Sequence, residues 1–453
     1  MISLQKLMHM VDDSIDEIVN LEQNLVRIPS VNTGKMPTGN ESEVCQYISD
    51  WLSVEGIKSD LLARDAGRDN LIVNYPLGPT ENCKLLLMSH TDVVPVENES
   101  KWKHDPFGGE ILGGRIYGRG SSDCKALLTS QLMSFVIMNR AGVQINRGLR
   151  LISGADEEHG GRWGFGWLAD NHPEILKSEF AVNEGGGTPV ELGDSLYYLL
   201  GIGEKGRMEI KITLKGESAH ASVPWTGINA SYSLSKTLEL IRNYQPDLDT
   251  SLPLFEHLKN FGIENEVSEK NINQIVKSLE DKIPVLASLT RALSRMTITP
   301  TIINGGIKSN SVPEEIVLIC DIRTLPFQDE DYVKSELHKL FTDVDNIDYE
   351  IDYMSVPNSS PFETELAQSI KKAHGIAVNR NDITWIPSIS NGFTDSRFTR
   401  NLGTITYGFS GSHPNDDPRL SMVHGTDESV GIESLISCTK STIALAYDMC
   451  EAK

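Results

Sequence analysis

Apolar side chains recur at two different periods along this chain, and the two kinds of segment alternate. Helical spacing, with apolar residues three or four positions apart, predicts helices over residues 4–28, 44–52 and 125–139. Short and almost continuously apolar runs, typical of buried parallel strands, lie at residues 70–75, 84–88, 149–153, 180–182 and 404–407. Because strands and helices alternate, we expect an α/β fold with an open, mostly parallel sheet.

The middle of the chain follows another pattern. Residues 207–214 alternate polar and apolar side chains, as in a strand with one exposed face. Further elements are predicted in the order helix, strand, strand, helix, strand, at residues 228–242, 297–303, 315–322, 329–341 and 349–353. This order predicts an inserted α+β (ferredoxin-like) unit with helices on one face of its sheet. Residues 253–295 add helical segments whose role the pattern does not indicate.

With 453 residues the chain is too long for a single hydrophobic core. We therefore predict two domains. Residues 1–204 and 356–453 would form the larger domain, and residues 205–355 would form the inserted one.

Composition narrows the possible partners. The 63 acidic and 41 basic side chains give a formal net charge of -22, which repels nucleic-acid phosphates and anionic lipids. We expect neither nucleic acid nor membranes as partners. Six scattered cysteines without a CxxC pair argue against a disulfide framework or a cysteine zinc site. The acidic, amphipathic N-terminal segment does not resemble a secretory signal, and no apolar run reaches about 20 residues. The cytoplasm is the predicted location.

Several predicted strands run directly into histidine or acidic residues. The strand at 84–88 precedes His90, the strand at 149–153 precedes Glu157 and Glu158, and the strand at 180–182 precedes Glu184. In open α/β sheets the carboxyl ends of the strands meet at one edge, where ligands bind. A further acidic residue, Asp123, lies between a glycine-rich turn and a predicted helix. Aspartate, glutamate and histidine without thiolates form a ligand set suited to zinc or similar divalent metals.

Each of these residues also has an ordinary structural interpretation. A lone histidine at a strand end is more often a hydrogen-bonded structural residue. The pair Glu157–Glu158 resembles a solvated loop, and Asp123 could cap the helix that follows it. The convergence of several such groups at one edge of the sheet favours the metal site.

Nine stretches resemble, in order, a superfamily of metallopeptidases and cover the chain from about residue 20 to its end. They are SHTDVVPV, WKHDPFGGEILGGRIYGRGSSDCK, SGADEEHGG, NEGGG, EKG, GESAHASVPWTGINA, GGIKSNSVPEEIVLICDIRTLP, NGFTDSRF and MVHGTDES. The superfamily comprises aminoacylases, glutamate carboxypeptidases, acetylornithine deacetylases and succinyl-diaminopimelate desuccinylases. Two histidines near the C-terminus, His413 and His424, could supply the last metal ligand. The match of HGTDES favours His424.

The resemblance implies a centre of two divalent ions, zinc in the first place and cobalt or manganese as alternatives. His90 and Glu184 would hold one ion, Glu158 and His424 the other, and Asp123 would bridge them. The chain departs from the superfamily beside this bridge. Cysteine stands at position 124, where an acidic residue is common, and alanine at position 126, where glycine is usual.

Two further residues receive catalytic roles from the resemblance. Asp92 would accept the second N–H of the His90 imidazole and fix its tautomer. Glu157 would be the general base, close to the attacking water but not itself a ligand. Neighbouring residues on a strand point in opposite directions, which would separate this base from the coordinating Glu158.

The substrate-binding residues follow from the same resemblance. Arg323 would hold a substrate carboxylate through a bidentate pair. His220 and Asn310 would reach the scissile carbonyl from the inserted domain, and Thr394 would belong to a substrate loop. An ordinary loop histidine and a surface arginine are the alternative interpretations of His220 and Arg323.

Together these observations predict a metal-dependent hydrolase that cleaves the amide bond of a small dipeptide or N-acyl amino acid carrying a carboxylate. The inserted domain would act as a lid and as the contact surface of a homodimer, as the resemblance implies. One alternative keeps the metals but makes the enzyme an aminopeptidase that recognises a free amine. Another is a non-catalytic binding protein on the same fold. The sequence does not distinguish dipeptidase, carboxypeptidase, deacetylase and desuccinylase activities.

Overall fold

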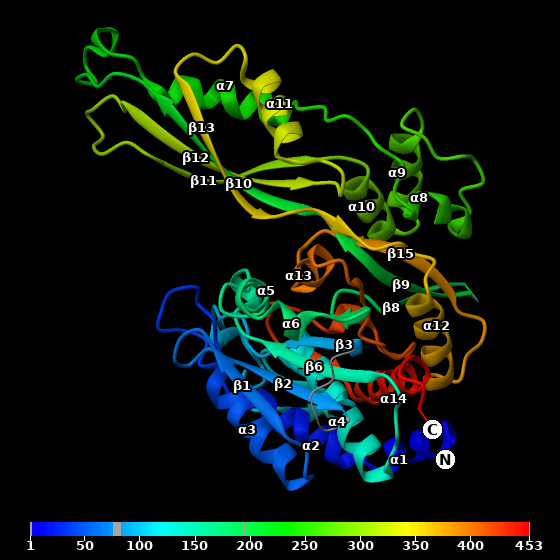
Figure 1. Cartoon of the computed structure of the whole chain (residues 1–453). Helices are drawn as coiled ribbons and strands as arrows, with labels where there is room; N and C mark the ends of the chain where they lie inside the picture. The colour runs from blue at the N-terminus through cyan, green and yellow to red at the C-terminus, as the bar shows by residue number, and fades with distance from the viewer. Residues whose placement is uncertain (1, 76–82, 194, 453) are drawn as a thin grey trace. The chain divides into compact units, whose positions relative to one another are not determined.

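The computed structural model describes residues 2–75, 83–193 and 195–452. They form two compact units, shown together in Figure 1. The first unit comprises residues 1–202, 360–388 and 394–453, and the second comprises residues 203–359 and 389–393. Strand β9 (Ser195–Glu204) runs from the first unit into the second, so the chain passes between them within one element.

A ten-stranded sheet organises the first unit, in the order β1-β2-β6-β3-β7-β16-β9-β14, with β8 and β15 also paired to β9. Its other strands are β1 (Ser59–Ala63), β2 (Asp69–Tyr75), β3 (Cys83–His90), β6 (Gly148–Gly154), β7 (Phe180–Asn183), β8 (Thr188–Leu192), β14 (Asn358–Ser359), β15 (Thr384–Ser390) and β16 (Ile405–Gly408). The central strands β6, β3, β7 and β16 are parallel. The predicted α/β fold is thereby confirmed. Strand β2, however, runs antiparallel to β6, so the parallel orientation expected for residues 70–75 was wrong.

Helices cover this sheet. They are α1 (Leu4–Asp13), α2 (Ile15–Val26), α3 (Glu41–Val54), α4 (Ala126–Ala141), α5 (Phe165–Asn171), α6 (Pro173–Leu176), α12 (Glu365–Ala377), α13 (Ser396–Asn401) and α14 (Ile432–Met449). The single helix expected at residues 4–28 is divided at Ser14, whose backbone leaves the helical conformation (φ -106°, ψ 12°). A small sheet of β4 (Glu110–Leu112), β5 (Arg115–Tyr117) and β17 (Ser429–Gly431) completes the unit.

The core of the first unit explains the apolar runs in the sequence. All eight residues of β3 are buried. On one face Leu86 and Met88 pack with Phe165 and Leu168 of α5, and α4 and α14 contact the strand as well. Because both faces of a central parallel strand are covered, the middle of β3, residues 85–88, is continuously apolar rather than alternating.

The second unit contains a four-stranded antiparallel sheet in the order β11-β12-β10-β13. Its elements are β10 (Gly206–Lys215), α7 (Ala230–Arg242), β11 (Thr297–Gly305), β12 (Glu315–Thr324), α11 (Glu330–Phe341) and β13 (Ile347–Ser355). This is the β-α-β-β-α-β order of a ferredoxin-like unit. Ile210 and Leu318 face Val333 and Leu337 in one core, so helices cover one face of the sheet. Residues 253–295 form α8 (Leu254–His257), α9 (Ile272–Glu280) and α10 (Pro284–Leu293) in the same unit.

Among the described residues, no helix is both long and apolar enough to cross a bilayer.

Candidate metal centre

Adjacent strands of the central sheet deliver three of the predicted ligands to one edge. His90 is the last residue of β3 and lies opposite Gly154, the last residue of β6. Glu184 follows β7, the other neighbour of β3. The acid pair Glu157–Glu158 lies in a short 3₁₀ turn after β6 rather than on the strand, so the expected alternation of their side chains along a strand was wrong.

The donor atoms form two groups that share one carboxylate. In the first, the Nε2 atom of His90 lies 3.0 Å from Oδ1 of Asp123 and 3.6 Å from Oε1 of Glu184. In the second, Nε2 of His424 lies 3.1 Å from Oδ2 of Asp123 and 3.1 Å from Oε2 of Glu158. Within each group the possible ligand atoms lie within 4.8 Å of one another. Asp123 thus presents one oxygen to each group, the arrangement that a bridging ligand requires.

Cys124 also falls in the first group, but its thiol is engaged elsewhere. The backbone N–H of His90 donates to its Sγ atom at 3.1 Å. Burial raises the pKa of this thiol well above its ordinary value, so a metal ion that bound it would have to displace its proton.

The electrostatics of the groups favour cations. Burial, followed by the charge of Asp123, raises the pKa of Glu184 to about 8. Burial also raises the pKa of Glu158 to about 7, against the hydrogen bond from His424. Carboxylates this crowded repel one another, and positive charge placed among them relieves the repulsion. Oxygen and imidazole donors fit zinc and other divalent first-row ions.

Glu157 belongs to neither group of possible ligands. It is 7% exposed, and burial, followed by the charge of Glu184, raises the pKa of its carboxyl well above the ordinary value. Its backbone N–H donates to Oδ1 of Asp92 at 3.0 Å. The carboxyl group therefore lies beside the donor groups, held by its main chain, without being counted among their ligands.

Asp92 lies beside the His90 imidazole with both its main-chain oxygen and its carboxylate. The Nδ1 atom of His90 lies 2.9 Å from the main-chain oxygen of Asp92 and 3.5 Å from its carboxylate. The carboxylate accepts hydrogen bonds from the backbone N–H groups of Glu157 at 3.0 Å and Glu158 at 3.2 Å. One residue thus orients the imidazole through its carbonyl and the acid pair through its side chain.

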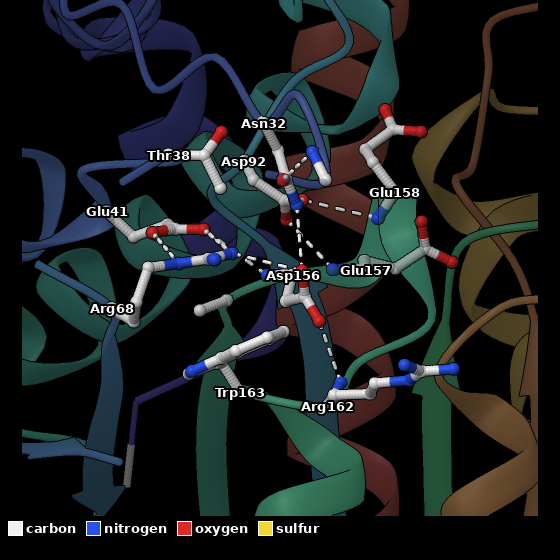
Figure 2. Close-up of polar contacts among 12 residues, drawn as sticks. Asn32, Thr38, Glu41, Arg68, Asp92, Asp156, Glu157, Glu158, Arg162 and Trp163 are labelled. Atoms are coloured by element: carbon white, nitrogen blue, oxygen red, sulfur yellow. Dashed lines mark hydrogen bonds and ion pairs between the residues drawn. The ribbon is translucent and has the colours of Figure 1, made fainter. Parts of the chain in front are cut away.

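A buried network continues from Asp92 beneath the acid pair, as Figure 2 shows. The side-chain amide of Asn32 donates to the carboxylates of Asp92 at 2.8 Å and Asp156 at 3.0 Å. Arg68 forms two hydrogen bonds to Glu41, at 2.7 and 2.8 Å, and a third to Asp156 at 3.1 Å. Asp156 has a left-handed backbone (φ 65°), which turns the chain immediately before the acid pair. The network fixes that turn from three distant parts of the sequence.

The bridging position has its own support. The carboxylate of Glu428 accepts hydrogen bonds from the backbone N–H groups of Ser122 at 3.0 Å and Asp123 at 3.1 Å, and it pairs with Arg119. All of Glu428 is buried. This role was not predicted from the sequence, although Glu428 lies in the same HGTDES stretch as His424.

The predicted substrate-binding residues are divided between the two units. His220 and Asn310 are exposed neighbours in the second unit, where the backbone N–H of Ala221 donates to the carbonyl of Asn310. In the first unit the hydroxyl of Thr394 is buried, accepts from the amide of Asn183 at 3.3 Å and donates to a neighbouring serine. Thr394 thus contacts the residue immediately before Glu184.

Arg323 lies on β12 directly opposite Arg207 of β10. Both guanidinium groups donate to Asp321, at 2.7 Å from Arg323 and 2.9 Å from Arg207. One carboxylate between two guanidinium groups leaves one net positive charge. Arg207 was not predicted from the sequence, because its proximity to Arg323 depends on the register of two strands more than 100 residues apart.

Comparison with known proteins shows which class of protein shares this fold. A protein of Staphylococcus aureus (strain MSSA476) named "Probable succinyl-diaminopimelate desuccinylase" is 28% identical over 379 residues, covering 81% of this chain and 82% of that protein. The crystal structure of an M20 family metallo-carboxypeptidase from Sulfolobus solfataricus matches with a TM-score of 0.72 at 18% identity, covering 96% of this chain and 99% of that one. Human carnosine dipeptidase 1 matches with a TM-score of 0.68 at 14% identity, covering 99% of this chain and 100% of that one.

The chain is a member of the class of metal-dependent hydrolases. Residues 86–448 match peptidase family M20/M25/M40, and the chain belongs to that family. The predicted superfamily and the prediction of an enzyme are confirmed. The alternative of a non-catalytic binding protein has no support in these relatives.

The network beneath the acid pair leads to a prediction on stability. Arg68→Met would leave Glu41 and Asp156 buried without their cation, which should lower the free energy of unfolding by about 3–5 kcal/mol. Arg140 offers a matched control, because it also binds two carboxylates, Glu17 and Glu55, but at the surface. Arg140→Met should cost about 0–1 kcal/mol. Urea unfolding of both variants measures the difference, and equal losses would contradict the network's importance.

Proposed function

We propose that this protein is a dinuclear metallohydrolase that cleaves the amide bond of a small dipeptide or N-acyl amino acid. The observation that carries the proposal is the position of Asp123, whose two carboxylate oxygens face two separate donor groups. His90 and Glu184 complete one group, and His424 and Glu158 complete the other. Zinc is the proposed metal, with cobalt or manganese as alternatives, because the donors are imidazoles and carboxylates.

Two divalent ions held by these donors would supply a water of lowered pKa and positive charge near the carbonyl oxygen. Proton transfer and positioning are the work of side chains of the protein itself. Glu157, buried and outside the ligand groups, accepts a proton from the attacking water at its carboxylate and passes it to the leaving amine. Asp92 and Asn32 hold the backbone from which this carboxyl group projects. Burial and the charge of Glu184 raise the pKa of Glu157 in the absence of cations, and divalent ions bound by the neighbouring donors would lower it again, so that the carboxylate could accept the proton.

The carboxylate of the substrate would bind to the paired arginines of the second unit. Arg207 and Arg323 share Asp321, so the three groups together keep one positive charge. Arg323 also donates from NH1 to the main-chain oxygen of Asn391 at 2.9 Å, and a bound carboxylate would replace that contact. A planar guanidinium group binds a carboxylate through two parallel hydrogen bonds. An aminopeptidase would instead need acidic groups at this position for a free amine, so the arginine pair favours a substrate with a carboxylate.

His220 and Asn310 would act on the site of a second copy of the chain. Strand β12 begins at Glu315 and ends at Thr324. His220 and Asn310 lie beyond its first residue, whereas Arg323 lies next to its last. Eight residue steps of about 3.4 Å separate Glu315 from Arg323, a distance of about 27 Å, whereas a dipeptide spans only about 7 Å. One small substrate therefore cannot touch His220 and Arg323 of the same chain. A homodimer with the second unit as its contact surface resolves this separation.

The first test of the proposal is metal content. Purified protein should contain about two divalent ions per chain by elemental analysis, since a bridging carboxylate serves paired ions. Removal of the ions with a chelator should abolish hydrolysis of dipeptides and N-acyl amino acids, and zinc, cobalt or manganese should restore it. His90→Ala and His424→Ala should each lower the metal content, because each removes a donor from a different group. Full activity in metal-free protein would end the proposal.

The second test separates the base from the ligands. Glu157→Gln should retain both metals but lose roughly 10²–10⁴-fold in kcat, the usual contribution of a positioned acid–base group. Glu158→Gln is the matched control, because the same change in the neighbouring residue should lower metal content. Metal loss with Glu157→Gln and retention with Glu158→Gln would show that the two roles are exchanged.

The third test concerns the dimer. His220→Ala should lower kcat by about 10²–10³, the loss expected for one donor that stabilises a developing oxyanion, while the metals stay bound. Mixing His220→Ala with Glu157→Gln protein, under conditions that exchange subunits, should restore activity. If His220 acts on the partner, each mixed dimer has one intact site and one site with both changes. Activity that stays low after proven exchange, or a fully active monomer, would contradict action between subunits.

A further inference from the structure

Residues 102–120 belong to one of the stretches that resemble the metallopeptidase superfamily, yet within the described part of the chain they supply no ligand to either donor group. They lie against residues 421–428, the His424 loop. Strand β5 of the stretch pairs with β17, which directly follows the loop. The backbone N–H of Lys103 donates to the carboxylate of Asp427 in the loop at 2.8 Å. The stretch is therefore in contact with the loop that carries one of the two ligand histidines.

The His424 loop has no regular structure of its own. Its residues are all among those described, and they form no helix or strand. Met422, His424 and Asp427 have a left-handed backbone, with φ of 48°, 61° and 58°. Non-glycine residues keep this conformation only where neighbouring groups hold them. The side chain of His424 is 51% exposed, so packing against the protein does not fix its imidazole.

Arg119 is the side chain that holds the main chain of this loop. Its NH2 group donates to the carbonyl oxygens of His424 at 3.3 Å and Gly425 at 3.1 Å. Among the described residues, no other side chain is hydrogen-bonded to the main chain of residues 422–426. Arg119 is itself buried, and its guanidinium group lies over the ring of Trp102, 5.3 Å from the ring centroid. The loop is thus attached to a group that is already fixed.

The same guanidinium group also contacts the support of the bridging ligand. Its NH1 atom pairs with the buried carboxylate of Glu428, which accepts the backbone N–H groups of Ser122 and Asp123. One planar group therefore serves both the bridging position and the loop. A lysine in its place would keep a cation beside Glu428, but its single ammonium group could not reproduce the fork that reaches both.

The first donor group does not depend on this contact. His90 is the last residue of the buried strand β3, and its imidazole is 1% exposed. The Nδ1 atom of His90 lies 2.9 Å from the main-chain oxygen of Asp92. Glu184 follows the neighbouring strand β7. The sheet itself therefore positions the first group, whereas the second depends on the loop.

We propose that Arg119 is a positioning residue for the second ion. Through the carbonyl groups of His424 and Gly425 it holds the loop where the imidazole of His424 meets Asp123 and Glu158. The inference rests on the proposed function, because it concerns one ion of the proposed pair. Groups that orient metal ligands typically contribute about 10–100-fold to metal affinity. Arg119 contributes at this level to the ion held by Glu158 and His424, and not to the ion held by His90 and Glu184.

The test is zinc binding by the metal-stripped full-length protein, measured in competition with a chromophoric chelator. Wild-type protein should bind two ions per chain. Arg119→Lys should weaken one of them by about 10–100-fold and leave the other nearly unchanged. Arg115→Lys is the matched control, because Arg115 is also buried and pairs with Asp416, but no hydrogen bond joins it to residues 422–426. This control should leave both affinities unchanged.

The two histidine variants identify the affected ion. In His424→Ala protein the second group has already lost its imidazole, so adding Arg119→Lys should not weaken the remaining ion further. In His90→Ala protein, adding Arg119→Lys should weaken the remaining ion by about 10–100-fold, because that ion uses the loop. Equal losses in both backgrounds would show that Arg119 only supports the fold and would overturn the inference. A loss in Arg115→Lys as large as in Arg119→Lys would overturn it as well.

Arg119→Gln is the second variant in case Arg119→Lys does not fold. Its amide can donate to Glu428 but is too short to reach the loop as well, so the same unequal loss is expected. Failure of both variants to fold would overturn the inference, because Arg119 would then serve the fold. Two ions bound with unchanged affinity in either folded variant would overturn the inference and leave the proposed function intact. Fewer than two ions in the wild type would count against the proposed function, and the inference would fall with it.

Discussion

The concentration of negative charge at one edge of the sheet is the constraint on which the first unit depends. Asp123, Glu157, Glu158 and Glu184 are carboxyl groups largely withdrawn from water. Burial of unpaired charge is costly, and the raised pKa values of Glu158 and Glu184 express that cost. Two imidazoles offset part of it, and divalent cations would offset the rest. A stable fold would be easier to build without this cluster, so its presence points to function rather than packing.

The surrounding structure holds the cluster in place with further buried carboxylates. Asp92 accepts the backbone N–H groups of the acid pair, and Glu428 accepts those at the bridging position. Asp156, in the turn before the acid pair, accepts hydrogen bonds from Arg68 and Asn32. A carboxylate that accepts several N–H donors fixes backbone rather than side chain. The reactive groups are thus positioned through their main chains, and their side chains remain available to ligands and to water.

In the second unit two arginines share one aspartate and keep a net positive charge, and we propose that this charge binds the carboxylate of the substrate. The strongly acidic surface of the whole chain, with a net charge of -22, makes such a local positive site the more distinctive.

The sequence by itself determined the α/β class, the positions of most elements and the family, because buried strands and their polar ends form contiguous signals. His90 and Glu184 each stand two positions after an apolar run, so their meeting at one sheet edge could be predicted. Only the tertiary structure decided the direction of β2, the 3₁₀ turn that carries Glu157, and the position of Arg207 opposite Arg323. The network of Asn32, Glu41, Arg68 and Asp156 also emerged only there. These features depend on strand register and on hydrogen bonds between distant segments, and neither leaves a periodic trace in a single sequence.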